Sequence, residues 1–225
     1  MKKAKYILFE GSEGTGKTTQ ASEIVKALKN KGLSVLDTKE PGTPHSPITL
    51  ELRKIMLDGK YEENFKEDAK VAREMISQSI RTLHLQNVIF PNLHQNDYII
   101  QDRGIVSGLA YGVACENDYS LIEYLSTQAI GPKKRSEGKT IYNLYDQIFY
   151  FKGNLKKGLD RALAAKQEFS AGDAMENKGL SFLEQVNQNF EDYLKTFAAQ
   201  TNVVVVEVEG KTIEEVTQEI LSKII

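Results

Sequence analysis

The chain has 225 residues, 40% of them hydrophobic and 27% charged, which suits one sizeable domain with a buried core. Its formal net charge of −2 excludes a global positive field that would recruit nucleic acid or an anionic membrane, and the basic residues within 131–139 indicate a solvated surface loop. A single cysteine, Cys115, permits neither an intramolecular disulfide nor a thiolate metal site. No apolar stretch approaches the roughly 18 residues that span a bilayer, and no signal-peptide pattern is present, so we expect a cytoplasmic protein.

Short β-rich runs alternate with longer helical patterns along the chain, which predicts a parallel sheet covered by helices on both faces. Strands are expected at residues 6–10, 33–38, 98–101, 147–151 and 203–208. Helices are expected at residues 17–31, 48–57, 65–90, 155–165, 179–199 and 212–225, with a polar, glycine-containing segment at 166–178. The four valines at 203–206 are typical of a strand that is buried on both faces.

A glycine-rich loop joins the first predicted strand to the first predicted helix. Its residues match G-x-x-x-x-G-K-[ST] at every fixed position and are Gly11, Ser12, Glu13, Gly14, Thr15, Gly16, Lys17 and Thr18. An accidental match in a chain of this length has a probability on the order of 1%. Successive backbone N–H groups of such a loop, with a helix N-terminus behind them, point at phosphate oxygens. We therefore expect a nucleoside triphosphate here, with Lys17 reaching its β- and γ-phosphates and Thr18 holding Mg²⁺.

A carboxylate directly follows the third predicted strand. Asp102 lies at the carboxyl edge of the sheet, where ligands bind in open α/β folds. There it can hold the Mg²⁺ shell or orient the attacking oxygen, and Arg103 beside it is suited to clamp a second phosphate. An isolated Asp-Arg pair would be interpreted as a surface ion pair, but the phosphate loop on the neighbouring strand favours the functional interpretation.

From Phe9 onward the chain resembles the thymidylate kinases over essentially its whole length. The order and spacing of short motifs carry the resemblance: Phe9-Glu10-Gly11, Lys39-Glu40-Pro41-Gly42, Leu52-Arg53, Met56-Leu57-Asp58-Gly59, Arg81 ten residues before Pro91, Asp102-Arg103 followed by Ser107-Gly108-Leu109-Ala110-Tyr111, and Phe182, Val186 and Phe190. It implies a single kinase domain over residues 1–225 of the P-loop NTPase type, a three-layer α/β/α fold with a five-stranded parallel sheet. A small helical lid is expected at about 166–178, and the family's long helix implies a homodimer.

The resemblance also implies transfer of the ATP γ-phosphate to a deoxynucleoside monophosphate, most simply dTMP. The residues agree with this chemistry, because the acceptor phosphate is already a nucleophile and phosphoryl transfer needs positioning and charge neutralisation more than a strong base. Thr19 adjoins the loop, and Arg161 would stack on adenine or pair with Asp160. The acceptor-binding residues would be Glu40, Pro41, Arg53, Ser77, Arg81, Arg103, Ser107 and Tyr111.

Two positions around the expected base depart from the family pattern. Ser77, one helical turn before Arg81, replaces the aromatic residue that stacks on thymine, and Gly104 replaces the aromatic residue that follows Asp-Arg. Stacking of this kind is worth roughly 1–3 kcal/mol. We therefore expect an enlarged acceptor site and an acceptor that is not limited strictly to thymidylate.

The basic residue that neutralises the transferred phosphoryl group is missing from its family positions. No residue between Gly11 and Gly16 is basic, and Ala174 stands where the lid can carry an arginine. An arginine in this role can be worth 10³ or more in rate. We expect Lys166 to supply the lid's cation and so count Lys17, Asp102, Arg103 and Lys166 as the catalytic set.

Two other functions stay open at this point. A deoxynucleoside kinase would need a general base such as Glu10 at the acceptor hydroxyl. A nucleotide-binding module that has lost transfer activity would agree with the missing arginine and aromatics. The histidines show no metal-ligand spacing, and we expect His84 to lie at the surface or to be half-buried.

Overall fold

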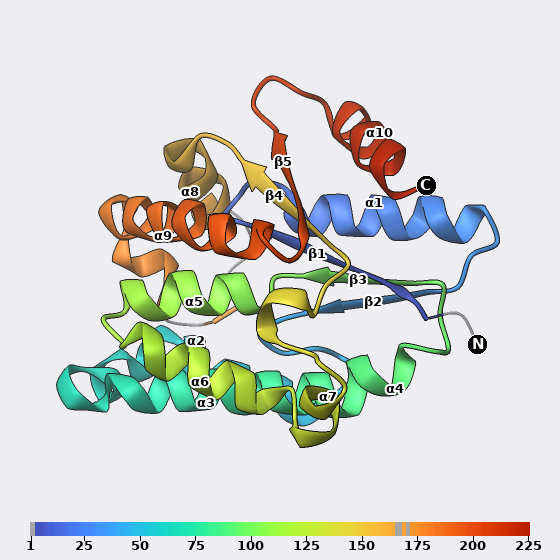
Figure 1. Ribbon diagram of the computed structural model, residues 1–225. Coiled ribbons are helices and arrows are strands. Elements are labelled where there is room, and N and C mark those ends of the chain that lie inside the picture. Colours follow the sequence, from blue (N-terminus) through green and yellow to red (C-terminus); the bar gives the residue numbers. More distant parts are fainter. Residues whose placement is uncertain (1–2, 165–167, 170–171) are drawn as a thin grey trace.

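The computed structural model describes residues 3–164, 168–169 and 172–225, and its centre is a parallel sheet between two layers of helices (Figure 1). The strands are β1 (Lys5–Gly11), β2 (Val35–Lys39), β3 (Tyr98–Asp102), β4 (Gln147–Lys152) and β5 (Asn202–Glu207). They form a 5-stranded sheet in the order β2-β3-β1-β4-β5, with every neighbouring pair parallel. Within the described ranges, each helix is too short or too polar to traverse a bilayer.

The helical elements connect these strands. The α-helices are α1 (Lys17–Asn30), α2 (Pro47–Leu57), α3 (Lys70–His84), α4 (Phe90–Asn92), α5 (Ile105–Ala114), α6 (Tyr119–Ala129), α7 (Pro132–Ser136), α8 (Leu155–Ala164), α9 (Leu180–Ala198) and α10 (Ile213–Ile224). The shorter turns are the 3₁₀ elements η1 (Gly59–Phe65), η2 (Glu67–Ala69), η4 (Ile141–Asn143) and η5 (Glu176–Lys178), and the π-helical turn η3 (Leu85–Ile89).

The two faces of β1 divide the core. Successive strand residues point to opposite faces, and Ile7 and Phe9 pack in a cluster with α1 and α10, whereas Tyr6 and Leu8 pack in a cluster with α5 and α9. Figure 1 shows these helix pairs on opposite sides of the sheet. The expected three-layer α/β/α architecture with a five-stranded parallel sheet is confirmed.

The last strand is less buried than its four valines predict. β5 is an edge strand that pairs only with β4. Val206 is fully buried, but Val205 is 51% exposed, so the expectation of burial on both faces is wrong. An edge position leaves one flank of the strand uncovered, which a local run of β-branched residues cannot reveal.

The helices between β2 and β4 also differ from the sequence expectation. The long helix begins at Lys70 instead of residue 65, because two 3₁₀ turns precede it, and it continues through the π-turn to Asn92. Pro91 lies just after the π-turn in this continuous helical run, which ends one residue later at Asn92. α5 and α6 were not predicted, and the expected loop at 131–139 contains the short helix α7.

The strand order places the functional region. β1 lies between β3 and β4, and Phe9 of β1 is in register with Asp102 at the end of β3. The loop after β1 therefore starts beside Asp102, at the carboxyl edge of the sheet.

Candidate functional site

The glycine-rich loop connects β1 to α1 as the sequence predicts. Gly14 has a φ of +63°, and a Cβ there would lie 2.0 Å from the carbonyl oxygen of Gly158 in α8. A Cβ on Gly158 would in turn lie 2.4 Å from the carbonyl oxygen of Glu13. Only glycine fits at these two positions, so the loop and α8 meet backbone to backbone.

Lys17, at the start of α1, is folded onto this loop. Its Nζ donates hydrogen bonds to the Ser12 carbonyl oxygen at 2.6 Å and to Thr15 Oγ1 at 3.3 Å. Burial lowers the pKa of Lys17 to about 8, and the nearby Arg103 adds to that shift. The amine is a buried cation held by neutral oxygens, which an anion can replace.

Thr18 and Asp102 form the oxygen-rich part of the site. Thr18 Oγ1 donates to Asp102 Oδ2 at 2.5 Å. Asp102 Oδ1 is buried and has no hydrogen-bond partner among the described residues. Those residues contain no cluster of three or more histidine, cysteine or acidic ligands. One carboxylate with a free oxygen, plus a hydroxyl, fits Mg²⁺, which takes one or two protein carboxylates and completes its shell with waters and phosphates.

A cavity of about 190 Å³ adjoins the loop. All of the expected acceptor-binding residues line it, namely Glu40, Pro41, Arg53, Ser77, Arg81, Arg103, Ser107 and Tyr111. They come from the end of β2, from α2, α3 and α5, and from the turn after β3. The residues that the sequence groups together therefore line one cavity.

Glu13 links the loop to this cavity, although the sequence placed it only on the ATP side. It is paired with Arg103 Nη2 at 2.8 Å and accepts a hydrogen bond from the Tyr111 hydroxyl at 2.9 Å. Burial raises the pKa of Glu13, but Arg103 and Lys17 outweigh it and bring the pKa to about 2. The Arg103 guanidinium also lies over the Tyr111 ring, 5.4 Å from its centroid. These contacts fix Arg103 at the junction between loop and cavity.

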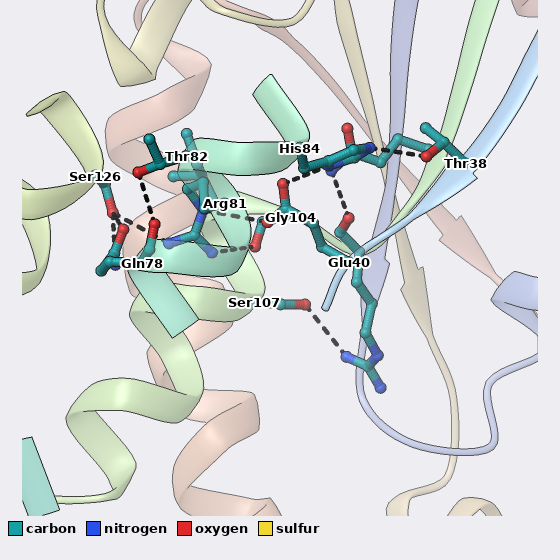
Figure 2. Close-up of polar contacts among 12 residues, drawn as sticks. Thr38, Glu40, Gln78, Arg81, Thr82, His84, Gly104, Ser107 and Ser126 are labelled. Carbon is teal, nitrogen blue, oxygen red and sulfur yellow. Dashed lines mark hydrogen bonds and ion pairs between the residues drawn. The ribbon is translucent and has the colours of Figure 1, made fainter. Parts of the chain in front are cut away.

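A buried ion-pair network joins Glu40, Arg81 and His84 beside the cavity (Figure 2). Glu40 Oε2 accepts from Arg81 Nε at 3.2 Å, and Glu40 Oε1 lies 2.8 Å from His84 Nδ1. His84 Nε2 lies 2.8 Å from the Thr38 hydroxyl. His84 is 0% exposed, so the expected surface or half-buried position is wrong. Burial raises the pKa of Glu40, but Arg81 and then His84 outweigh it and lower the pKa below its ordinary value.

Gly104 lines the cavity, but the space that its missing side chain was expected to open is already occupied. A Cβ there would meet the Tyr145 hydroxyl at 2.5 Å and the Gln101 amide nitrogen at 2.9 Å. The space that a side chain at this position would enter is thus filled by Tyr145. Ser77, the other departure from the family pattern, does line the cavity.

Glu10 is buried and forms hydrogen bonds at the N-terminus of α5. It is 0% exposed, and its Oε1 accepts from the backbone N–H groups of Gly104 at 2.9 Å and Ser107 at 3.0 Å. The Ser107 hydroxyl donates to its other oxygen. The carboxylate therefore satisfies the N-terminus of α5 and does not line the cavity.

The remaining expected residues lie elsewhere. Arg161 donates from Nε to the Lys157 carbonyl oxygen at 3.1 Å and lines a second cavity, of about 610 Å³, with Thr15, Gly16 and Thr19. Arg53 forms a two-bond ion pair with Glu168, at 2.9 Å and 3.2 Å. Lys166 lies outside the described residues.

Several lining residues were not assigned from the sequence. Glu74 lies seven residues before Arg81, and Asn117 and Cys115 follow α5. The helical spacing between Glu74, Ser77 and Arg81 was a usable signal, because residues 3, 4 and 7 apart share one face of a helix. Asp173 and Glu176 also line the cavity. Burial is the largest cause that raises the pKa of Glu176 to about 7, and the nearby charges of Asp173 and Glu13 add to it.

Comparisons with known proteins agree with this geometry. The family model described as "Thymidylate kinase" matches residues 9–220. A thymidylate kinase of Helicobacter pylori (strain P12) is 33% identical over 208 residues, covering 92% of this chain and 90% of the relative. A thymidylate kinase of Campylobacter curvus (strain 525.92) is 35% identical over 196 residues, covering 84% of this chain and 85% of the relative. A thymidylate kinase of Nostoc sp. (strain PCC 7120 / SAG 25.82 / UTEX 2576) is 31% identical over 224 residues, covering 97% of this chain and 95% of the relative. The chain therefore belongs to the thymidylate kinase family.

Proposed function

We propose that this chain transfers the γ-phosphate of ATP to dTMP, giving ADP and dTDP. An oxygen of the acceptor phosphate attacks the γ-phosphorus, and the bond between that phosphorus and the β–γ bridging oxygen breaks with its electron pair staying on ADP. The observation that carries the proposal is the junction at Glu13 and Arg103, where the phosphate loop and the acceptor cavity share residues. A donor in the loop and an acceptor in the cavity would meet at this junction.

On the donor side, backbone N–H groups of the loop would hold the ATP phosphates, with Lys17 at the β- and γ-phosphates. Thr18 and Asp102 would hold Mg²⁺, consistent with the free, buried Oδ1 of Asp102. The ion supplies charge neutralisation on the β- and γ-phosphate oxygens when bound. Thr19 and Arg161 would line the nucleoside side of ATP, in the second cavity.

On the acceptor side, Arg53 and Arg103 would bind the phosphate of dTMP, and Tyr111 would pack near its sugar. Arg81 and Ser107 would contact the base, with Arg81 held in place by Glu40. Pro41 would form an apolar wall of the base site, and Ser77 would form a second wall with a small side chain. Burial of these groups increases the strength of each charge–charge contact with the nucleotide.

Segment 166–178 is proposed as the lid, with Lys166 as the cation that approaches the transferred phosphoryl group. The other lysine of this segment, Lys178, pairs with Glu62 at 2.9 Å. A closed lid would exclude water, so that ATP is transferred and not hydrolysed.

A cytoplasmic homodimer is part of the proposal. Met75 on α3 and Tyr124 on α6 are 54% and 61% exposed, and Figure 1 shows these two helices side by side. Exposed large apolar residues on adjacent helices favour a protein contact. The mass measured by light scattering during gel filtration tests this, with twice the chain mass expected.

The decisive experiment supplies purified protein with ATP, Mg²⁺ and one acceptor at a time, and measures ADP formation with chromatographic identification of the product. We expect dTDP from dTMP and no thymidylate from thymidine. Phosphorylation of thymidine would instead indicate a deoxynucleoside kinase, which the structural commitment of Glu10 disfavours. ATP binding without turnover of any acceptor would indicate a nucleotide-binding module.

A further inference from the structure

The acceptor cavity continues past Arg81 to an end that the proposed function does not use. This far end is lined by Glu74 of α3 and by Gly112, Cys115 and Asn117, which lie at and beyond the C-terminal part of α5. Glu74 precedes Arg81 by seven residues, which corresponds to about 10 Å along a helix axis. The side chains lie closer than this, because Arg81 reaches Gly108 and Glu74 reaches Gly112, so the far end is the part of the cavity about one turn of α5 beyond Arg81.

Two glycines of α5 allow polar side chains of α3 to reach into the cavity. A Cβ on Gly108 would lie 2.3 Å from Arg81 Nη2, and a Cβ on Gly112 would lie 2.9 Å from Glu74 Oε2. Any larger residue at either position would have to displace these groups. The two helices thus present Arg81 beside Gly108 and Glu74 beside Gly112, one helical turn further along α5.

Glu74 has one oxygen in use and one free. Its side chain is buried, with 4% of the residue exposed, and its Oε1 accepts from Gln78 Nε2 at 2.7 Å. Among the residues that the structure describes, Oε2 has no hydrogen-bond partner. The adjacent Arg73 is paired with Glu62 instead.

The bound oxygen of Glu74 belongs to the network that holds Arg81. Gln78 Nε2 also donates to Ser126 Oγ at 3.0 Å, and Ser126 Oγ accepts from Arg81 Nη1 at 3.3 Å (Figure 2). The Glu74 carboxyl is therefore fixed in position through Gln78, which limits the ways in which Oε2 could find another partner. Burial raises its pKa above the ordinary value for glutamate.

Asn117 supplies a second polar group at the same end. It is 9% exposed, and its Nδ2 donates to the Gly112 carbonyl oxygen at 3.2 Å. Its amide oxygen has no hydrogen-bond partner within the described part of the chain. The far end thus combines a carboxyl oxygen and an amide oxygen that a ligand can satisfy.

We propose that this far end recognises a hydroxyl-bearing substituent at C5 of a pyrimidine acceptor, bound through Glu74 and Asn117. The proposal rests on the proposed function, which places the acceptor phosphate at Arg53 and Arg103. With the phosphate there, the pyrimidine edge opposite the sugar, which carries C4 and its neighbour C5, would point along the cavity toward Glu74. Ser77 has the small volume that leaves this path open.

The chemistry of a hydroxyl fits these partners better than the methyl of thymine. A hydroxyl both donates and accepts, so it pairs with Glu74 in either protonation state and with the Asn117 amide oxygen. A methyl can form a hydrogen bond with neither of these oxygens. Sites built to bind a hydroxyl discriminate strongly against analogues that lack it.

The test compares 5-hydroxymethyl-dUMP with dTMP as acceptors for the full-length protein. We expect the ratio of their kcat/KM values to be at least one in the wild-type protein and to fall about tenfold in Glu74→Leu. Glu74→Gln keeps a polar group at this place and is expected to retain the ratio within about threefold. Glu116→Leu, at an exposed carboxylate outside the cavity, is the matched control and should leave the ratio unchanged.

A ratio of acceptors is insensitive to the fraction of protein that folds, so a partly unfolded variant does not obscure the result. A wild-type ratio below one overturns the inference, as does an equal ratio in wild type and Glu74→Leu. If neither acceptor is phosphorylated, the proposed function fails instead. The thermal stabilisation by each monophosphate then reports its affinity, and a smaller shift with 5-hydroxymethyl-dUMP than with dTMP would overturn the subsite.

Discussion

The phosphate loop and the acceptor cavity hold their cations in different ways. Lys17 in the loop contacts a carbonyl and a hydroxyl oxygen, whereas the cavity arginines are paired with carboxylates of the same chain. These pairs join Arg53 to Glu168, Arg81 to Glu40 and Arg103 to Glu13. A phosphate entering the loop replaces neutral partners. A phosphate entering the cavity would have to compete with carboxylates for Arg53 and Arg103. The loop therefore holds a cation that is open to an anion, whereas the cavity's arginines already have anionic partners.

The largest effect is expected from Lys17→Met in the loop. The variant should lower kcat for dTMP by about 10³-fold, because it removes the cation at the transferred phosphate. Its thermal stability should not fall, since burial already disfavours the Lys17 charge and lowers its pKa. Lys26→Met, at an exposed position of the same helix, is the control. A loss below tenfold in a steady-state assay would contradict the assigned role.

Glu40→Gln changes the buried ion pairs beside the cavity, and its main expected effect is a loss of stability. The change leaves Arg81 and His84 without their buried carboxylate, and we expect the free energy of unfolding to fall by about 3 kcal/mol. In a chain of this length the melting temperature should fall by roughly 6–12 °C. Glu51, which forms an exposed ion pair with Lys54, provides the control. Glu51→Gln should change the free energy of unfolding by less than about 0.5 kcal/mol. Equal losses in the two variants, measured by urea titration, would contradict the network's role.

The pH dependence of stability should separate the two regions. The pKa of Glu13 is lowered to about 2, so its contribution to stability is present above its ordinary pKa of 4.5 and is lost as the pH falls toward 2. The pKa of Glu176 is raised to about 7, so its carboxyl favours the folded state only while protonated, and stability declines as the pH rises from 4.5 through 7.

Melting curves recorded between pH 4.5 and pH 7.5 test the Glu176 part. Glu176→Gln should flatten the decline across that window, whereas Glu184→Gln, an exposed change on α9, should leave it intact. A decline that persists in Glu176→Gln would assign it to another group.

The smallest effect is expected from Glu168→Gln. Glu168 is half exposed and its pair with Arg53 is worth under about 1 kcal/mol, so freeing Arg53 should lower the KM for dTMP about threefold with kcat nearly unchanged. Glu63→Gln, which breaks the exposed Lys66 pair, is the matched control. An increase in KM would show that Glu168 supports acceptor binding instead of competing with it.

The two regions also differed in how well the sequence predicted them. The loop was predicted residue by residue, because its glycines, Lys17 and Thr18 act through local backbone geometry that a contiguous motif specifies. The residues expected to bind the acceptor came from short, scattered motifs whose order resembles a family, and the structure brings them into one cavity. Their pairing partners were not predictable, since Glu40 meets His84 and Arg53 meets Glu168 only through tertiary contacts.

The missed elements have a similar physical origin. α5 is apolar on nearly all sides and contains glycines, so it lacks the 3.6-residue periodicity that marks a half-buried helix. Gly104 was expected to enlarge the cavity, but the hydroxyl of Tyr145, 41 residues away in sequence, occupies the space beside it. His84 was expected near solvent because its buried partners lie on another element, at the end of β2.

The contact between Gly14 and Gly158 has a consequence for how the gene can vary. Backbone atoms of Gly158 exclude a side chain on Gly14, and the carbonyl oxygen of Glu13 excludes a side chain on Gly158, so replacing either glycine does not make room for a replacement at the other. A deep mutational library selected for growth should therefore be depleted of every substitution at both codons, including alanine at position 158, in the first turn of α8, although alanine is ordinarily the most favourable residue in a helix. These two glycines would then stay unchanged while the surrounding sequence varies.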